Sequence, residues 1–291
     1  MYKLLKKSFH ILFTEGASAF LAKVLRKIIF VYNRITFHPY IKVLPLGDEK
    51  IIFLISSLFA KEIYDNKDNI EKWSELYWVR DNQLVTGDLA VDCGSNTGYT
   101  SLFFSQCVGK NGSVYCFEPQ PDNAKAAIVN IKMNNCKNVT IENVALGAKK
   151  GIVNFIDVPN GSVGVLEDTK SIKVQMTTLD DYFSKIHPNF LKIDVEGYEI
   201  EVLKGGKRIL SENPKLDIEI HCAAYQNRES GVAELLSLIN ISKYDIYLQL
   251  ERNSSVCYYD HKKITPKLIS EHDNIHLFAI PIKSVLREEG L

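Results

Sequence analysis

The residues of this sequence that are best suited to chemistry lie at every second position of two short apolar runs. In the first run, Lys192, Asp194 and Glu196 alternate with leucine, isoleucine and valine. Successive side chains of an extended strand point to opposite faces, so these three charged groups share one face. A buried lysine needs a partner, and we expect Lys192 to form a structural ion pair. Asp194 and Glu196, at the open end of the run, are candidates for catalysis or substrate binding.

The second run repeats the alternation with Asp217, Glu219 and His221. If the two runs form neighbouring strands, carboxylates and an imidazole meet at one edge of a sheet. Such a cluster can remove a proton from a hydroxyl group, and Asp194, Glu196 and His221 are all candidate bases, with a structural ion pair as the alternative role. The imidazole has the most suitable ordinary pKa, whereas a carboxylate needs burial to raise its pKa. Oxygen ligands of this kind also suit Mg²⁺, but we expect no required metal.

A glycine-containing loop follows an apolar run and precedes a helical stretch. It reads Asp-Cys-Gly-Ser-Asn-Thr-Gly, and Gly94 and Gly98 permit a tight turn against which a ligand can lie. The dinucleotide fingerprint G-x-G-x-x-G is absent, because Asn96 stands where its middle glycine would be. Asp92 would repel a pyrophosphate but attract an ammonium group. The loop therefore favours an amino-acid-bearing cofactor such as S-adenosylmethionine, with Asp92, Gly94, Ser95, Asn96 and Gly98 as candidate contacts.

Two further positions are candidates for contact with the same cofactor. The next apolar run ends in Phe117-Glu118-Pro119, about twenty residues after the loop, where an acid can accept both hydroxyls of a ribose. A surface carboxylate is the alternative role of Glu118. The third run ends near Asn143, whose position alone predicts that it lies near the adenine.

These residues must be positioned by strands and helices that alternate from residue 89 onward. The expected strands are Leu89–Cys93, Ser113–Phe117, Val139–Val144, Phe190–Val195 and Leu216–Ile220, and the expected helices are Tyr99–Cys107, Pro121–Met133, Tyr198–Leu210 and Gly231–Ile239. Strands separated by helices indicate right-handed βαβ units and a doubly wound α/β domain with a mostly parallel sheet. Two last runs, Tyr244–Leu250 and Ile275–Ile280, have no crossover helix between them and predict an antiparallel pair at one edge.

The segment before this domain has a different pattern. Tyr40–Leu44 and Ile51–Ile55 flank a Gly-Asp turn signal and predict a β-hairpin. A helix is expected over Asn69–Arg80. We therefore divide the chain into an extension over residues 1–39, a hairpin and helix over residues 40–82, and the main domain over residues 83–291.

The extension is basic and apolar. Residues 1–45 contain eight lysines and arginines and one glutamate, a net charge of +7, and apolar residues recur there at helical spacing. No apolar run approaches the ~20 residues of a spanning helix, and no signal-peptide cleavage pattern is present. Residues 1–39 thus predict basic amphipathic helices on an anionic membrane surface. Docking on the main domain or on a second subunit is the alternative.

The composition excludes several classes of protein. The 291 residues are 46% hydrophobic and 24% charged, which is typical of a globular chain and not of a disordered or collagenous one. Six cysteines without a CxxC pair predict free thiols and a reducing compartment. A formal net charge of zero argues against nucleic acid as a partner. We expect a cytoplasmic protein, peripheral on the inner face of a membrane, and the sequence does not predict its oligomeric state.

Four motifs, in this order, resemble those of the FkbM-type methyltransferases. They are Asp92–Gly98, Phe117–Pro119, Thr178–Asp180 and Leu191–Glu199. The resemblance covers roughly residues 85 to 225 and implies a Rossmann-like, S-adenosylmethionine-dependent methyltransferase, typically acting on oxygen atoms of sugars or secondary metabolites. It also implies that the first motif holds the methionine end of the cofactor and that Glu118 binds the ribose. The family often has alanine where this chain has Ser95, which is a mild departure.

The function expected from these observations is O-methylation of a sugar, glycolipid, glycan precursor or small-molecule acceptor. One alternative is a nicotinamide-dependent oxidoreductase on a similar sheet, which the missing loop glycines disfavour. Another is a membrane-docked protein that keeps the fold without catalysis. The identity of the acceptor does not follow from the sequence.

Overall fold

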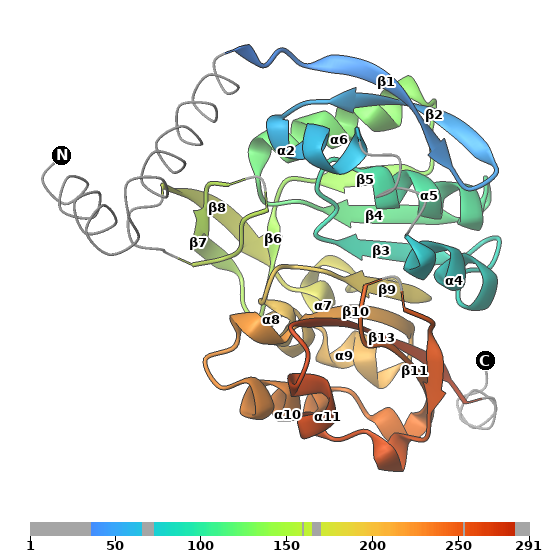
Figure 1. Ribbon diagram of the computed structural model, residues 1–291, viewed down its shortest axis with the longest axis vertical. Helices are drawn as coiled ribbons and strands as arrows, with labels where there is room; N and C mark the ends of the chain where they lie inside the picture. The colour runs from blue at the N-terminus through green and yellow to red at the C-terminus, as the bar shows by residue number, and fades with distance from the viewer. Residues whose placement is uncertain (1–35, 66–72, 159, 165–169, 253, 283–291) are drawn as a thin grey trace, which may run out of the picture.

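The computed structural model describes residues 36–65, 73–158, 160–164, 170–252 and 254–282 (Figure 1). The extension over residues 1–39 therefore lies almost entirely outside the described residues, and its membrane role stays a prediction. Among the described residues, no helix has both the length and the apolar character needed to cross a bilayer. All six cysteines are free thiols, as expected.

The fold is built on an eight-stranded sheet with the order β12-β11-β13-β10-β9-β3-β4-β5 (Figure 1). The strands are β3 (Leu89–Cys93), β4 (Ser113–Phe117), β5 (Val139–Glu142), β9 (Phe190–Ile193), β10 (Lys215–His221), β11 (Tyr244–Gln249), β12 (Cys257–Tyr259) and β13 (Asn274–Pro281). Neighbours from β5 to β10 are parallel, whereas β13 is antiparallel to β10 and β11. The predicted Rossmann-like sheet with an antiparallel edge is therefore confirmed. The strand order reverses between β3 and β9, and in such sheets ligands bind at this point.

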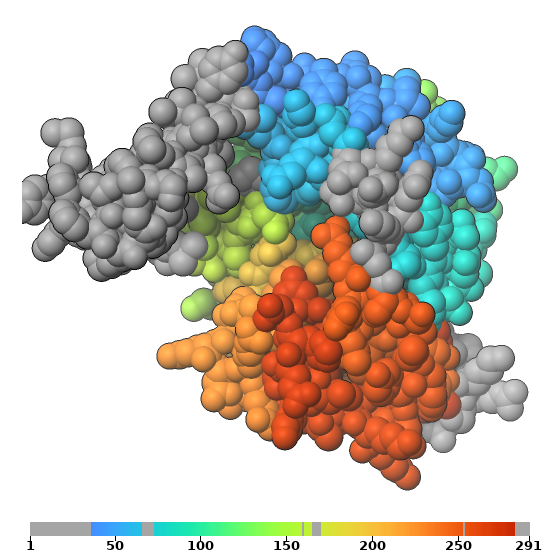
Figure 2. Space-filling model, in the orientation of Figure 1, coloured from blue at the N-terminus to red at the C-terminus, as the bar shows by residue number. Residues whose placement is uncertain are grey.

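Helices cover both faces of the sheet. The helices are α2 (Leu58–Tyr64), α4 (Ser74–Asn82), α5 (Tyr99–Val108), α6 (Pro121–Met133), α7 (Leu179–Tyr182), α8 (Glu199–Lys204), α9 (Lys207–Ser211), α10 (Arg228–Leu238) and α11 (Pro266–Ser270), with 3₁₀ turns η1 (Cys222–Ala224), η2 (Ile241–Lys243) and η3 (His261–Lys263). Alternate residues of β3 face the apolar cores on the two sides of the sheet. Ala90 belongs to the core that contains residues of α2, α4, α5 and α6, and Val91 belongs to the core that contains residues of α7 to α11. Figure 2 shows these layers from outside, with the hairpin in blue and the C-terminal elements in orange and red.

The structure corrects the prediction of one continuous helix over Tyr198–Leu210. α8 ends at Lys204 and α9 begins at Lys207, with Gly205 and Gly206 between them. Gly205 packs so closely that a Cβ there would lie 2.0 Å from the backbone oxygen of Gly147. The two glycines therefore interrupt a helical pattern that the apolar spacing alone could not divide.

Several elements were not expected from the sequence. β6 (Ala145–Leu146), β7 (Gly151–Ile156) and β8 (Ser171–Thr177) form a separate sheet with the order β6-β8-β7 and a small core of its own. β12 and α11 occupy the segment between the last two long strands, which was expected to be irregular. The small sheet matters for function, because the loop after β7 reaches the ends of the central strands.

The predicted hairpin is confirmed as β1 (Tyr40–Leu46) paired with β2 (Glu49–Ile55). Its second strand lies along α6, where two asparagines take the place of a neighbouring strand. Asn134 bonds both the amide and the carbonyl of Ile52, and the Oδ1 atom of Asn130 accepts a 2.6 Å bond from the amide of Leu54. Asn130 also donates a 2.8 Å bond to the carbonyl of Thr97, in the glycine-containing loop. One side chain thus joins the hairpin to that loop.

The double role of Asn130 makes its loss costly. Asn130→Ala leaves a buried carbonyl and an amide without partners, and we expect it to lower the free energy of unfolding by about 2 to 4 kcal/mol. Asn134→Ala is the matched control and should cost about 1 kcal/mol, because its groups lie nearer to solvent. Urea unfolding of both variants checks this. An equal loss of stability in the two variants would contradict the assignment.

Candidate active site

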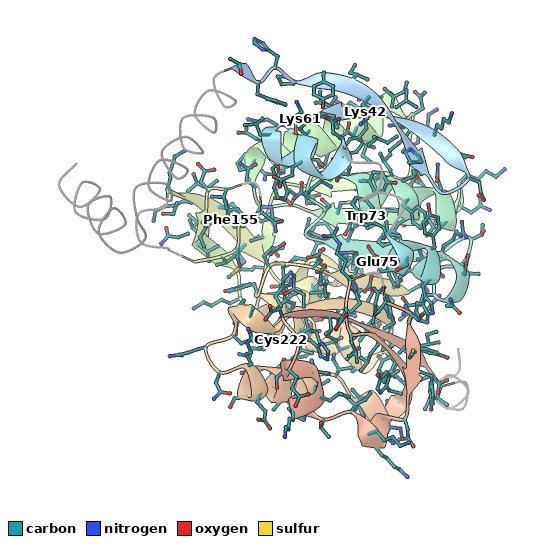
Figure 3. The ribbon with its side chains drawn as sticks, in the orientation of Figure 1. Lys42, Lys61, Trp73, Glu75, Phe155 and Cys222 are labelled. Atoms are coloured by element: carbon teal, nitrogen blue, oxygen red, sulfur yellow. The ribbon has the colours of Figure 1, made fainter. Side chains whose placement is uncertain are left out.

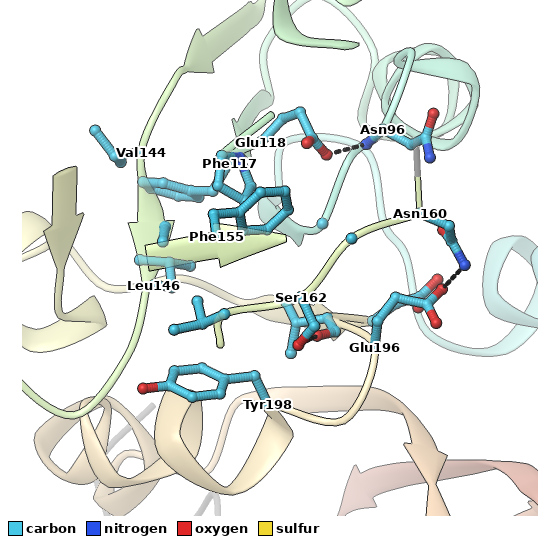
Figure 4. A pocket seen from close by; sticks show the side chains of 17 residues that line it. Asn96, Phe117, Glu118, Val144, Leu146, Phe155, Asn160, Ser162, Glu196 and Tyr198 are labelled. Carbon is cyan, nitrogen blue, oxygen red and sulfur yellow. Dashed lines mark hydrogen bonds between the residues drawn. The ribbon is translucent and has the colours of Figure 1, made fainter. Parts of the chain in front are cut away.

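A cleft that is open to solvent lies at the point where the strand order reverses (Figure 4). Its polar wall includes Glu118 on one side and Asp194 and Glu196 on the other. Its apolar wall comes from the end of β4, from the small sheet with its adjoining loops and from the start of α8, with the side chains of Phe117, Val144, Leu146, Phe155, Val163 and Tyr198. A polar rim beside an apolar wall suits a cofactor that carries both a charged end and an aromatic ring.

The glycine-containing loop sits at one edge of the cleft with a backbone that requires glycine. Gly94 has φ +91°, and a Cβ atom there would lie 1.8 Å from the backbone oxygen of Asp194. Gly98 has φ +87° and begins α5 directly above Ala127. The amides of Gly94 and Ser95 both donate to the carbonyl of Phe117, at 2.9 and 3.1 Å. The loop is therefore packed against β9 on one side and tied to β4 on the other.

Glu118 is positioned by the backbone around it. Its carboxylate accepts 2.8 Å bonds from the amides of Asn96 and Gln120, and its side chain borders the cleft (Figure 4). Burial raises the pKa of this carboxyl to about 7, although the two amide bonds act in the opposite direction. Asn143 lies behind it and donates to the carbonyls of Glu118 and Pro119 at 2.8 and 3.1 Å. Asn143 thus supports the turn, whereas its neighbour Val144 lines the cleft.

Two of the loop candidates point into the protein. Asp92 is fully buried and accepts a 2.7 Å bond from Ser101, and burial raises its pKa to about 6. Its other oxygen and the hydroxyl of Ser95 have no hydrogen-bond partner among the described residues. Neither side chain lines the cleft, while Gly94 and Asn96 do. Direct contact of Asp92 with a cofactor therefore stays a prediction.

The two charged runs meet on neighbouring strands, as expected. Lys192 is buried and donates a 2.7 Å bond to Asp194, which confirms its predicted ion pair. Asp217 faces Lys192 directly across the β9–β10 pair. Burial acts to lower the pKa of Lys192, but the surrounding carboxylates raise it well above its ordinary value. The same lysine outweighs the effect of burial on Asp194, so that the pKa of this carboxyl falls below its ordinary range.

His221 lies in the middle of the acids. Its Nε2 atom is 3.5 Å from Glu196, 3.8 Å from Glu219 and 3.9 Å from Asp194. Its Nδ1 atom is 2.9 Å from Glu199, which is completely buried. Burial alone would lower the pKa of His221, but the bond to Glu199 and the nearby carboxylates raise it to about 10. In this arrangement the imidazole holds a proton at neutral pH, which favours a carboxylate over His221 as the candidate base.

Glu196 has the position and the pKa that a base requires. Its backbone takes φ +55°, and Gly197 follows with φ +93°, which turns the Glu196 side chain toward the cleft. Asn160, from the loop after β7, donates a short hydrogen bond to its carboxylate (Figure 4). Burial and the charge of Asp194 raise the pKa of Glu196 above its ordinary value. A carboxylate with a raised pKa at an open cleft can accept the proton of an acceptor group.

Sequence reasoning missed Glu199 and Asn160. Glu199 begins α8, where an acid normally faces solvent, yet here it accepts bonds from Tyr225 and from the amide of Gly197 at 2.9 and 2.8 Å. Asn160 lies in the loop after β7, in the region of the small sheet that was not expected. The sequence offered one signal for Glu199, since it stands next to the Asp194–Glu196 pattern, but none for Asn160.

A doubly wound sheet with this loop, a buried acid after the next strand and an acidic cluster after the fourth is the arrangement expected of an S-adenosylmethionine-dependent methyltransferase. Residues 92–253 match the family model described as the methyltransferase FkbM domain. The matched region is more than half of the chain, and the protein belongs to this family. The expected resemblance is confirmed.

Similar proteins include two curated methyltransferases. The hexuronic acid methyltransferase AglP of Haloferax volcanii is 29% identical over 160 residues, which is 53% of this chain and 64% of that protein. Methyltransferase 1 of Beauveria bassiana is 25% identical over 142 residues, which is 40% of this chain and 57% of that protein. The chain thus spans less than two thirds of the length of either relative.

Two solved structures are also among those similar to this chain. An S-adenosylmethionine-dependent O-methyltransferase from Thermotoga maritima gives a TM-score of 0.44 at 12% identity, covering 83% of this chain and 78% of that one. Fibrillarin from Aeropyrum pernix, solved with bound S-adenosylmethionine, gives 0.41 at 12% identity, covering 68% of each chain.

The close approach of Gly94 to Asp194 gives a test of the loop. Gly94→Ala should cost roughly 3 kcal/mol or more in unfolding free energy and abolish binding of S-adenosylhomocysteine, because the new Cβ displaces β9 from the loop. Gly87→Ala is the control: its φ is also positive, at +98°, but no atom lies within 4 Å of the new Cβ. It should cost about 1 to 2 kcal/mol of backbone strain and leave binding intact. Calorimetry and urea unfolding check both variants, and similar effects from the two would refute the role of the close approach.

Burial of Glu118 predicts a pH dependence of stability. Its pKa is about 7 in the folded protein and 4.5 ordinarily. Between pH 4.5 and pH 7, the folded state therefore keeps a proton on Glu118 that the unfolded state has lost. The stability from this group is therefore present below pH 4.5 and is lost as pH rises through 7, by roughly 3 kcal/mol. Relative to wild type, Glu118→Gln should gain stability over this interval. Unfolding curves at several pH values measure the difference, and parallel pH profiles would exclude the shift.

Proposed function

We propose that this protein is an S-adenosylmethionine-dependent O-methyltransferase whose acceptor is a sugar, a glycolipid or a glycan precursor. The observation that carries the proposal is the cleft itself, in which a buried acid borders one side and a carboxylate with a raised pKa borders the other. The name of the relative from Haloferax volcanii, a hexuronic acid methyltransferase, supports a sugar acceptor. A nicotinamide-dependent oxidoreductase has no such support, because the family is one of methyltransferases.

The residues on the cofactor side fit S-adenosylmethionine. The backbone of Gly94 approaches Asp194 too closely for any side chain, which leaves the loop surface to the ligand. Glu118 would accept the ribose hydroxyls, and Val144 and Leu146 would pack against the adenine ring. When bound, the cofactor supplies an electrophilic methyl group.

The residues on the acceptor side prepare an oxygen atom for attack. Glu196 accepts the proton of the acceptor hydroxyl, and Asn160 holds this carboxylate in place. Asp194 stays ionised because Lys192 binds it, so it accepts a second hydrogen bond from the acceptor and orients it. The positive charge of the protonated His221 offsets part of the negative charge of Asp194 and Glu196. Since the methyl donor is reactive by itself, alignment and proton removal account for most of the catalysis expected from the protein.

The experiment that tests this proposal is methyl transfer to a panel of acceptors. The purified protein is incubated with S-adenosylmethionine and with uronic acid glycans, neutral glycans or no acceptor. We expect S-adenosylhomocysteine and a product with one added methyl group only with a glycan, as measured by mass spectrometry. Resistance of that methyl group to alkali identifies an ether on a hydroxyl, whereas release by alkali identifies an ester on a carboxylate. Transfer to nitrogen or carbon would overturn the O-directed assignment.

Removal of the charge on Glu196 tests the base. Glu196→Gln should lower kcat on the order of 10²-fold or more, with calorimetric affinity for S-adenosylhomocysteine nearly unchanged. Glu201→Gln is the matched control, because Glu201 lies on α8 and pairs with Lys204 away from the cleft. It should keep full activity. A Glu196→Gln enzyme as active as this control would show that another group takes the proton.

A further inference from the structure

The geometry points to a divalent metal cation bound by Asp194, Glu219 and His221, beside the cleft. The sequence alone predicted no required metal. The inference stands apart from the proposed function, because it concerns binding of the ion and needs neither cofactor nor acceptor.

The first observation is the distance between the groups. One oxygen of each carboxylate and one nitrogen of His221 all lie within 4.8 Å of one another, on neighbouring ends of β9 and β10. Nε2 of His221 is 3.9 Å from Asp194 Oδ1 and 3.8 Å from Glu219 Oε1. These separations exceed hydrogen-bond length and also exceed the roughly 3 to 3.5 Å that separates neighbouring ligands around a cation with bonds of about 2.1 Å, so the three side chains must move closer together to hold the ion.

The second observation is the way in which His221 is held. Its side chain is 8% exposed, and Nδ1 lies 2.9 Å from the buried carboxylate of Glu199. Glu199 is fixed in turn by Tyr225 and by the amide of Gly197. Without a cation, Nε2 carries a proton that faces the carboxylate oxygens of Asp194 and Glu219. A cation that binds Nε2 takes the place of this proton, while Nδ1 keeps its bond to Glu199. A carboxylate behind one nitrogen of a buried imidazole, with the other nitrogen facing oxygen ligands, is the arrangement of metal-binding histidines.

The third observation is the charge of the surroundings. Lys192 bonds Oδ2 of Asp194 and leaves Oδ1 facing His221. Asp217 stands two residues before Glu219 on β10 and is fully buried. Its Oδ2 atom has no hydrogen-bond partner among the described residues. Glu75 of α4 approaches the same face (Figure 3). Acids outnumber bases here, and a divalent cation offsets charge that is costly to bury.

The ligand set indicates the kind of cation. Two carboxylates with one imidazole suit Mn²⁺ or Zn²⁺ better than Mg²⁺, which prefers oxygen ligands alone. Asp194 lines the cleft, whereas Glu219 and His221 lie behind it. A cation held by the three would therefore have its open side toward an acceptor and could bind acceptor oxygens directly.

The test uses Mn²⁺ and the purified full-length protein after treatment with a chelator, without cofactor or acceptor. Electron paramagnetic resonance measures free Mn²⁺, and we expect one ion bound per chain. Glu219→Gln should weaken binding at least tenfold. Asp217→Asn is the matched control, because it removes a buried charge from the same face of the same strand without removing a ligand. It measures the effect of local charge alone and should weaken binding less than Glu219→Gln does.

Three results would each count against the cation site. An undiminished spectrum of free Mn²⁺ with the wild-type protein overturns the site. Equal weakening by Glu219→Gln and Asp217→Asn also overturns it, because the ion would then respond only to local charge. If circular dichroism shows that Glu219→Gln is unfolded, Glu219→Asp replaces it: this variant keeps the charge but shortens the reach, and unchanged affinity in it counts against coordination. Failure of this test leaves methyl transfer untouched, and failure of methyl transfer leaves Mn²⁺ binding measurable.

Discussion

The structure depends on one positive charge buried where the strand order reverses. Lys192 lies in register with Asp92 on β3 and with Asp217 on β10, and it bonds Asp194 two residues further along its own strand. Three adjacent strands thus contribute carboxylates around a single ammonium group. Removal of one partner from a buried ion pair typically costs about 3 to 5 kcal/mol, since the remaining charge has no water to solvate it. The central strands are therefore held in register by charge as well as by their backbone ladder.

This constraint separates the two regions of one sheet face. Toward the amino ends of β3 and β9, Ala90 and Phe190 belong to the apolar core that also contains residues of α4 and α5. Toward the carboxyl ends, the same face carries acids, His221 and His276. The charged groups are thus gathered at the end of the sheet that reaches the cleft. The apolar core at the other end contributes the free energy of folding that offsets the cost of burying these charges.

The sequence predicted the framework well because the framework is local. Strand alternation identified the faces of β9 and β10, and the helix over Pro121–Met133 was predicted at its observed bounds because its proline and its apolar spacing are short-range signals. Features that depend on distant contacts were not predicted. Glu199 is buried under contacts with Tyr225 and His221, which are distant in sequence. Asn160 reaches Glu196 from the loop after β7, in a small sheet whose two longer strands are mostly exposed and therefore lack a continuous apolar run.

Protonation states were equally inaccessible to sequence reasoning. His221 was the favoured base by its ordinary pKa, and the surrounding acids reverse that preference. The sequence alone does not show how many carboxylates, from the ends of β9 and β10 and from α8, surround the imidazole of His221. Conversely, the need for glycine at position 94 could be predicted as a turn requirement, but its cause proved to be the backbone oxygen of Asp194.

The hydrogen bonds of Asn130 connect the hairpin to the glycine-containing loop, because its amide side chain bridges the backbone of Leu54 and that of Thr97. Coupling of this kind is reciprocal: whatever steadies the loop also steadies the hairpin, by the same free energy in both directions. We therefore expect a ligand that holds the loop to slow hydrogen exchange in β2, whose residues do not line the cleft. In the same way, a molecule that binds the hairpin would change how tightly the cleft holds its ligand.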